Sequence, residues 1–195
     1  MYEILWHGRG GQGAFTAAKL LGAAYSIEET NHFALSFPSF GPERRGAPIL
    51  AFTKLDSKPI GDRSQIKKAD YVVFLDDTLF TKNAFNEIKP NGKIFVNTKK
   101  TKEEFLCENG DVTTGATSSN SNSSTSDNVV LYDGDSIATR VLGLAVSNTV
   151  MLGLLAKEEN IVSKEDLIKA INLYMGSKIA AKNTMLIEEI FGGAK

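Results

Sequence analysis

The sequence predicts an α/β domain whose sheet is mainly parallel or mixed and is covered by helices on both faces. At the N-terminus an apolar run, a glycine-rich turn and a segment of helical spacing follow one another over residues 2–27. Further along, short runs of β-branched and aromatic residues alternate with segments of helical character. This alternation is typical of βαβ units, in which a helix carries the chain from one parallel strand to the next.

The first unit is a strand, a turn and a helix. Residues 2–7 are apolar and aromatic and end at a glycine cluster, which favours a buried strand followed by a turn. Residues 14–27 place Phe15, Ala18 and Leu21 at helical spacing. We therefore expect a three-layer, Rossmann-like arrangement that begins with this unit.

Two further strands are predicted at residues 32–37 and 49–55. The segment between them, residues 38–48, is predicted to be a loop because prolines and glycines interrupt it throughout. Loops of this length in compact domains are often functional.

The centre of the sheet is predicted from two more apolar runs. Residues 71–75 are almost continuously apolar, as expected of a strand covered on both faces. Residues 94–97 form another strand, introduced by a turn at 90–92, and residues 79–88 are expected to supply the crossover helix between the two. A late strand follows at 129–132. Amphipathic helices are then predicted at residues 148–158 and 164–170, with a third at 178–190.

Residues 113–128 are a serine, threonine and asparagine tract without an apolar anchor. Such a tract cannot bury enough surface to offset the entropy of ordering it, so we expect a mobile surface insertion within one domain spanning residues 1–195. Deleting the tract is therefore expected to leave the melting temperature nearly unchanged, which thermal denaturation of the shortened chain measures.

Composition limits the classes of function. The apolar fraction of 42%, charged fraction of 23% and formal net charge of −1 are typical of a soluble globular protein and give no reason to expect nucleic-acid binding. Cys107 is the only cysteine, so the chain cannot form an internal disulfide or supply the thiolates of an iron–sulfur cluster or a cysteine-rich zinc site. No stretch approaches the roughly 18 apolar residues of a membrane helix, and no signal peptide is recognisable. A cytoplasmic location without membrane contact is expected.

The glycine cluster is a candidate anion-binding loop. Gly8, Arg9, Gly10, Gly11, Gln12 and Gly13 fit the pattern G-x-G-x-x-G between a predicted strand and a predicted helix. Glycines allow close approach of a phosphate, and the helix N-terminus offers unpaired N–H groups. The alternative is that these glycines only make a tight turn. A nicotinamide dinucleotide is disfavoured because no acidic residue ends the second strand, and a kinase-type P-loop lacks its Gly-Lys-Ser/Thr ending.

The loop at 38–48 carries a second candidate site. Its pair of arginines, Arg44 and Arg45, follows Glu43 and can grip a carboxylate or phosphate, or pair across a subunit interface. The nearby Phe37 and Phe40 favour an interface, because aromatic residues and arginine are enriched in interface hot spots. The alternative is a solvated charge pair.

The remaining polar candidates do not form a recognisable catalytic set. His7 lies beside the glycine loop and can orient a ligand, but a structural histidine is the simpler interpretation. Asp76 and Asp77 end the central strand at the edge where open α/β sheets bind ligands, yet they can equally cap the next helix. No Ser/His/Asp or Cys/His arrangement is apparent, which indicates a binding module.

Several segments, in order, resemble one family. They include WHGRGGQGA at residues 6–14 and FPSFGPERRGAP at 37–48, followed by 58–60, 69–73 with Asp76, 91–92 with 96–98, and 148–153. Together they resemble the gamma subunit of pyruvate and related 2-oxoacid:ferredoxin oxidoreductases. The long loop is far more specific than the glycine pattern.

The resemblance implies a complex that oxidatively decarboxylates a 2-oxoacid, preferably pyruvate, in anaerobic metabolism. Electrons pass through iron–sulfur clusters to ferredoxin or flavodoxin, and the acyl group passes to coenzyme A. It also implies alpha, beta and delta partner subunits that hold the thiamine diphosphate and the clusters, so the isolated gamma chain is expected to be inactive.

For this chain the resemblance implies a part in coenzyme A access and in subunit assembly. The residues carried over to the coenzyme A phosphates are Gly8, Arg9, Gly10, Gly11, Gln12 and Gly13, and Arg44 and Arg45 are assigned to the interface or to the same phosphates. The alternative from another class is a free-standing dinucleotide-binding regulatory or redox protein, which would bind its nucleotide without partner chains.

Overall fold

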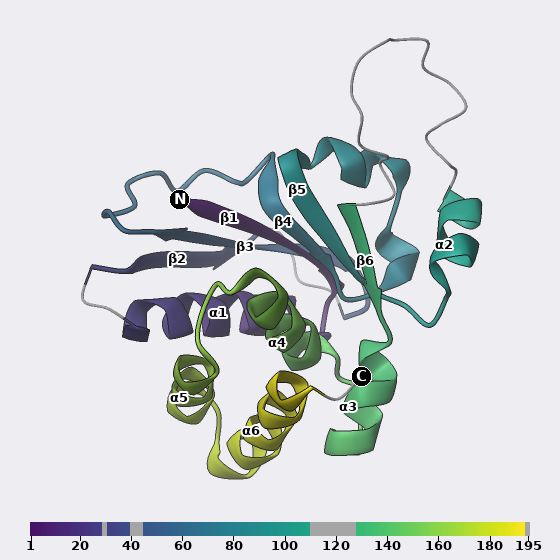
Figure 1. Cartoon of the computed structure of the whole chain (residues 1–195). Helices are drawn as coiled ribbons and strands as arrows, with labels where there is room; N and C mark the ends of the chain where they lie inside the picture. Colours follow the sequence, from purple (N-terminus) through teal and green to yellow (C-terminus); the bar gives the residue numbers. More distant parts are fainter. Residues whose placement is uncertain (29–30, 40–44, 110–127, 194–195) are drawn as a thin grey trace.

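A computed structural model describes residues 1–28, 31–39, 45–109 and 128–193 of the chain. The first half alternates strands with one long helix: β1 (Tyr2–Arg9), α1 (Ala14–Glu28), β2 (Phe33–Pro38), β3 (Pro48–Asp56) and β4 (Ala69–Phe74). The second half continues with η1 (Asp77–Leu79), η2 (Lys82–Asn86), β5 (Ile88–Asn97), α2 (Lys102–Asn109), β6 (Val129–Tyr132), α3 (Gly134–Leu142), α4 (Asn148–Glu159), α5 (Lys164–Tyr174) and α6 (Ser177–Gly192). Figure 1 shows these elements along the chain.

The strands of the described residues form one mixed sheet in the order β2-β3-β1-β4-β5-β6. β1, β4, β5 and β6 pair in parallel, whereas β3 is antiparallel to both β1 and β2. The α/β class with a mainly parallel or mixed sheet is confirmed. The antiparallel part has a simple cause, because only nine residues separate the end of β2 from the start of β3, and a parallel pair needs a crossover of about a dozen residues or more.

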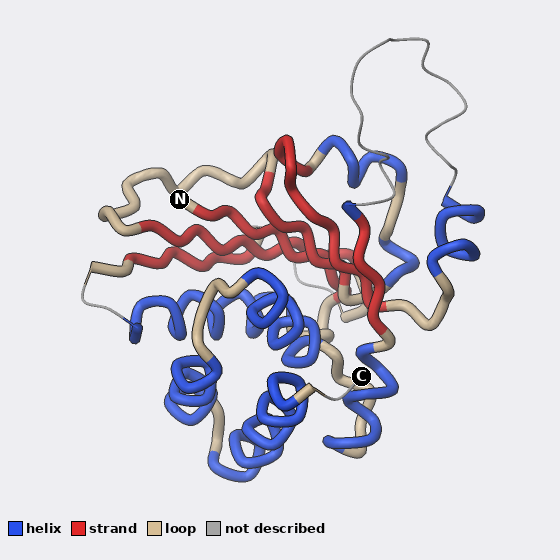
Figure 2. The backbone as a smooth tube through the Cα atoms, in the orientation of Figure 1, coloured by secondary structure: helices blue, strands red, loops and turns tan. Residues whose placement is uncertain are grey.

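Alternate residues of each central strand point into two different cores. Ile4, Trp6 and Phe95 enter a large core on the face covered by α1 and α3 to α6. Leu5 and Val72 enter a smaller core on the other face. In Figure 2 the helices α1 and α3 to α6, drawn in blue, gather below the sheet, whereas α2 lies apart from them (labelled in Figure 1).

Within the large core α4 is surrounded by other elements. Every residue from Asn148 to Ala156 is buried, because α4 lies between α1, α6 and the sheet. The prediction that this segment is an amphipathic helix was therefore wrong about its faces, although right about its position. α5 and α6 begin where predicted or one residue earlier and extend further, to Tyr174 and Gly192.

The second face carries short 3-10 helices in place of the crossover helix predicted at residues 79–88. Phe80 packs edge-on against Phe74, Phe85 and Phe105, with ring centroids 5.3, 5.7 and 4.8 Å apart. Phe80 and Thr81 have extended backbone angles, which ends η1 before η2 begins, so two short turns replace a continuous α-helix. Phe105 comes from α2, a helix that the sequence pattern did not reveal.

Other boundaries moved by a few residues. β2 and β3 run from Phe33 to Pro38 and from Pro48 to Asp56, so the ends of the predicted loop belong to strands. β5 already begins at Ile88, and the turn predicted at 90–92 lies inside it as an irregularity with Asn91 at φ 68°. α3 was not predicted. The serine-rich tract at 113–128 lies, apart from Asn128, outside the described residues.

The topology creates a crevice at one edge of the sheet. After β1 the chain passes through α1 towards β2 and β3, whereas β4 lies on the other side of β1. The carboxyl ends of β1 and β4 are therefore where the connections diverge, and open α/β sheets bind ligands at such a switch point.

Candidate functional site

A cavity of about 450 Å³ lies at this switch point. Its walls come from four segments that are far apart in the sequence. These are the glycine loop with Gly11 and Gln12, the end of β4 with Leu75 to Asp77, the end of β5 with Asn97 to Lys100, and α3 and the loop before α4 with Asp135 and Ala145 to Ser147. We call this cavity the crevice.

The glycine loop is a tight turn with two residues in the left-handed region. Gly11 has φ +97° and Gly13 has φ +83°, which side chains rarely adopt. The Gln12 N–H donates to the Arg9 carbonyl oxygen at 2.9 Å, and the Gln12 side chain closes the turn by accepting the Arg9 N–H at 2.7 Å. Gly13 then begins α1, since its carbonyl oxygen accepts from Ala17 N at 3.0 Å.

Arg9 holds the loop to two other segments. Its Nε donates to Asp76 Oδ2 at 2.9 Å, its Nη2 to Thr78 Oγ1 at 2.8 Å and its Nη1 to the Gly46 carbonyl oxygen at 3.2 Å. Gln12 Nε2 donates to the same carboxylate oxygen of Asp76 at 3.1 Å. Of the glycine-loop residues only Gly11 and Gln12 line the crevice, so the arginine expected to meet a ligand is turned towards Asp76.

Asp76 is the acceptor at the centre of this network. Burial raises the pKa of its carboxyl group, but hydrogen bonds from Thr78, Gln12 and Arg9 outweigh burial and hold the pKa below its ordinary value. The Asp76 carboxylate also accepts the Thr78 N–H at 3.0 Å and so caps η1. Both interpretations of Asp76 made from the sequence therefore describe its place: it caps the helix that follows, and it lies at the carboxyl end of the central strand.

Replacing this carboxylate should make stability depend less on pH. Asp76→Asn is expected to lower the free energy of unfolding by about 1–2 kcal/mol at neutral pH, because a charge-assisted acceptor is lost. Since the pKa of Asp76 is lowered in the folded state, its contribution is complete above the unfolded pKa of about 3.9 and disappears as pH falls through the folded value. Urea unfolding of both chains between neutral and acid pH measures this, and a difference that does not shrink in acid would contradict it.

Asn97 connects three walls of the crevice. Its Nδ2 lies 3.0 Å from the Leu75 carbonyl oxygen, 3.0 Å from Asp135 Oδ1 and 2.9 Å from Ser147 Oγ. Its Oδ1 accepts from Gly134 N at 2.9 Å. The side chain is buried and joins β4, α3 and the loop before α4 at the end of β5.

Cations lie on the β5 side of the crevice. Lys99 and Lys100 follow β5, and a hydrogen bond to Glu108 raises the pKa of Lys100. Lys100 Nζ also lies 3.7 Å from Asp77 Oδ2, which accepts from Thr98 Oγ1 at 2.6 Å. Sequence reasoning gave no role to Lys99 and Lys100, although polar residues that follow a parallel strand are the signal that could have found them.

The second candidate loop is only partly described. Phe37 is half-buried and stacks on Phe52 with ring centroids 5.0 Å apart, and Arg45 is exposed and bridges to Gly10. Phe40, Glu43 and Arg44 lie outside the described residues. His7 is held by Glu87 at 2.8 Å and stacks on Phe74, an arrangement that fits its structural interpretation.

Two kinds of feature are absent from the described residues. No cluster of three or more His, Cys, Asp or Glu side chains suited to a metal ion occurs among them. Within the same ranges no helix is long and apolar enough to cross a membrane.

Comparison with known proteins covers nearly the whole chain. Residues 3–192 match the family model described as pyruvate ferredoxin/flavodoxin oxidoreductase. The chain is 40% identical to the pyruvate/ketoisovalerate oxidoreductases common subunit gamma of Thermococcus litoralis, over 98% of this chain and 96% of that one. It is also 40% identical to pyruvate synthase subunit PorC of Methanothermobacter marburgensis, over 94% and 92%.

A solved structure agrees with the sequence comparisons. Pyruvate oxidoreductase subunit PORC of Thermotoga maritima superposes with a TM-score of 0.75 at 27% identity, covering 100% of this chain and 97% of that one. The fold, the length and the sequence thus indicate the same family. The chain belongs to the pyruvate ferredoxin/flavodoxin oxidoreductase family, in which its similar relatives are gamma, or PorC, subunits.

Proposed function

We propose that this chain is the gamma subunit of a complex that oxidatively decarboxylates a 2-oxoacid, preferably pyruvate, and forms acyl-coenzyme A, CO2 and reduced ferredoxin or flavodoxin. The observation that carries the proposal is the similarity over almost the full length to gamma and PorC subunits. Alpha, beta and delta subunits hold the thiamine diphosphate and iron–sulfur clusters. The gamma chain acts as one domain over residues 1–195, in the cytoplasm, without turnover of its own.

Purification of the native protein tests this assignment. A tagged chain recovered from its own cells should bring partner subunits with it, and the complex should reduce ferredoxin when given pyruvate and coenzyme A. The isolated chain should not. Recovery of the chain without companions, or turnover by the chain alone, would refute the assignment. Tight binding of a nicotinamide or flavin nucleotide by the solitary chain would favour a free-standing regulatory or redox protein.

Within the complex, we propose that the crevice receives the phosphates of coenzyme A. A methyl group built on Gly11 would meet no atom within 4 Å, so the loop backbone is open to a ligand. Lys99 supplies positive charge on the β5 side of the crevice, and Lys100 compensates Asp77, a second carboxylate of the lining. The carboxylate of Asp76 is already compensated by Arg9, which reduces its repulsion of an anion. Arg45 lies next to the glycine loop at the Gly10 bridge and can add to this charge or contact a partner subunit.

The Michaelis constant for coenzyme A in the reconstituted complex tests the site. Gln12→Ala and Lys99→Ala should each raise it by roughly tenfold with little change in kcat, since uniform binding energy is lost. Arg9→Ala should raise it through distortion of the loop. Lys58→Ala is the matched control, because Lys58 is exposed and follows β3 at the opposite edge of the sheet. Unchanged coenzyme A binding after substitution of both Arg9 and Gln12 would defeat the glycine-loop assignment.

A further inference from the structure

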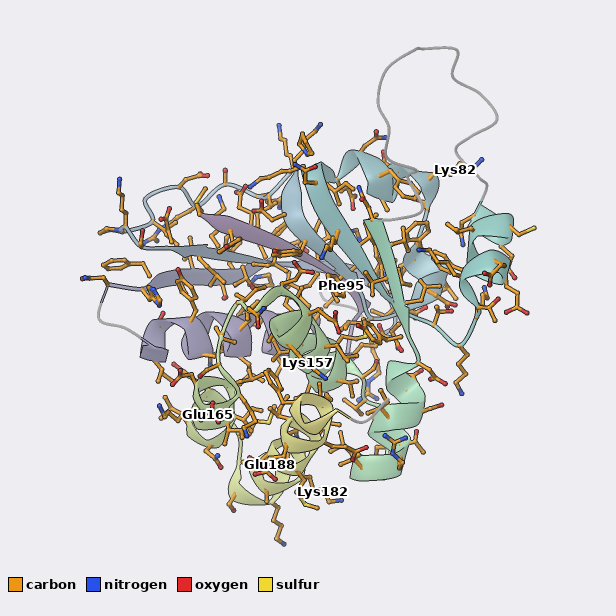
Figure 3. The ribbon with its side chains drawn as sticks, in the orientation of Figure 1. Lys82, Phe95, Lys157, Glu165, Lys182 and Glu188 are labelled. Atoms are coloured by element: carbon orange, nitrogen blue, oxygen red, sulfur yellow. The ribbon has the colours of Figure 1, made fainter. Side chains whose placement is uncertain are left out.

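A second hollow lies beside the crevice, between the α3–α4 loop (residues 143–147) and the start of α6. Its volume is about 510 Å³. Most of its lining is apolar and comes from Leu142, Leu144, Val146, Met175 and Ile179. We call it the α3–α4 groove, and Figure 3 labels Lys182 on the α6 side.

Three of the five apolar side chains that line this groove are exposed. Leu144 is 66% exposed, Ile179 60% and Val146 42%. Single exposed apolar residues are ordinary on a protein surface, whereas a hollow lined by several of them is typical of an interaction site. The groove therefore offers apolar area that a second surface can bury.

The charge around the groove has one sign. The ionisable residues that line it are Lys178 and Lys182, and no carboxylate is among the lining residues. Lys182 Nζ donates to the Leu142 carbonyl oxygen at 3.3 Å, and neither lysine forms an ion pair within the part of the chain that the structure describes. A surface with carboxylates beside apolar side chains would complement this rim, and a second copy of the same groove would bring like charges together.

The groove and the crevice share a wall. Val146 lines both, and Ser147 at the end of the same loop is tied to Asn97. On the groove side, Lys182 holds the Leu142 carbonyl oxygen next to Gly143, which has φ +76°. A partner seated in the groove would therefore contact the loop that closes one side of the crevice.

We infer that the α3–α4 groove is the docking site for a partner subunit of the complex, which inserts an apolar segment flanked by Asp or Glu residues. The inference rests on the proposed function, because it requires that partner subunits exist. Beyond the proposed function, the inference names the surface of this chain that binds a partner subunit and the chemical character of the segment that the surface recognises.

Association of the tagged chain with the subunits that co-purify with the wild-type protein tests the inference. Leu144→Asp and Ile179→Asp should each weaken their association by roughly tenfold or more, because a carboxylate is buried in an apolar contact. Lys178→Glu should weaken it less, and raising the salt concentration should reduce that difference. Leu173→Asp is the matched control, since Leu173 is 68% exposed but does not line the groove.

Melting temperatures of the free chains exclude misfolding, and two groove positions keep the test valid if one variant fails to fold. Unchanged association of both aspartate variants overturns the inference, as does an equal loss with Leu173→Asp. Sedimentation of the free chain that shows a dimer broken by Ile179→Asp also overturns it, because the occupant is then a second copy. If the wild-type chain recovers no companions at all, it is the proposed function that fails.

Discussion

Asn97→Ala is expected to lower the free energy of unfolding by about 3 kcal/mol, a large effect for one polar side chain. The substitution leaves the buried N–H of Gly134 without its acceptor and removes the donor that lies near Leu75, Asp135 and Ser147. Since these groups lie at the end of β4 and in the segment of α3 and the loop before α4, and Asn97 holds both to the end of β5, the same change should weaken coenzyme A binding in the complex. Urea unfolding of the free chain and the Michaelis constant for coenzyme A measure the two effects.

A surface asparagine provides the control for this prediction. Asn86 donates only to Asn83 Oδ1 and is exposed, so Asn86→Ala should change the stability by less than about 0.5 kcal/mol. Equal effects of the two substitutions would show that the contacts of Asn97 do not carry the stability of the crevice.

Asn97→Asp separates shape from hydrogen bonding. The carboxylate has the size of the amide but cannot donate, and it would face the Asp135 carboxylate and the Leu75 carbonyl oxygen in a buried position. Burial and the like charge should raise the pKa of the new carboxyl group in the folded state. The stability of Asn97→Asp relative to the wild type should therefore be highest below the unfolded pKa of about 3.9 and fall as pH rises through the folded value, whereas the deficit of Asn97→Ala should not follow this course.

The sequence predicts the layers of the fold better than the directions of its strands. Apolar runs and helical spacing identify the strands and α1, because those patterns record which faces are buried. The antiparallel direction of β3 depends on how the chain returns after residue 38, and no residue pattern within β3 encodes it. The burial of α4 on all sides likewise depends on α1 and α6, which are distant in the sequence.

The candidate site divides in a similar way. The glycine loop is recognisable because its residues are consecutive and lie between a strand and a helix. Pairing of Arg9 with Asp76 joins residues 67 positions apart, and the sheet order alone brings them together. From the sequence alone, Arg9 is interpreted as a free cation, whereas in the fold its side chain connects the glycine loop to Asp76, Thr78 and Gly46. The cations that line the crevice are instead the lysines after β5.

Gly13→Ala is expected to lower the free energy of unfolding by about 3 kcal/mol and to impair the glycine loop at the same time. A left-handed conformation costs about 1–2 kcal/mol for a residue with a side chain, and Gly13 has φ +83°. The new methyl carbon would also lie 2.4 Å from Asn148 Nδ2, so the buried Asn148 must move and lose its hydrogen bond to the Gly13 carbonyl oxygen. Urea unfolding measures the loss of stability.

Gly11→Ala is the matched control, because it isolates the conformational cost. Gly11 has φ +97°, but a methyl group there meets nothing within 4 Å, so its substitution should lower stability by only about 1 kcal/mol. The difference between the free energies of unfolding of the two variants then measures the contribution of the contact between the start of α1 and the start of α4. If both substitutions lower the free energy of unfolding by the same amount, close packing against Asn148 does not hold the glycine loop. If Gly13→Ala costs clearly more, α4 fixes the position of the loop, and the burial of α4 on all sides serves to place the candidate phosphate site.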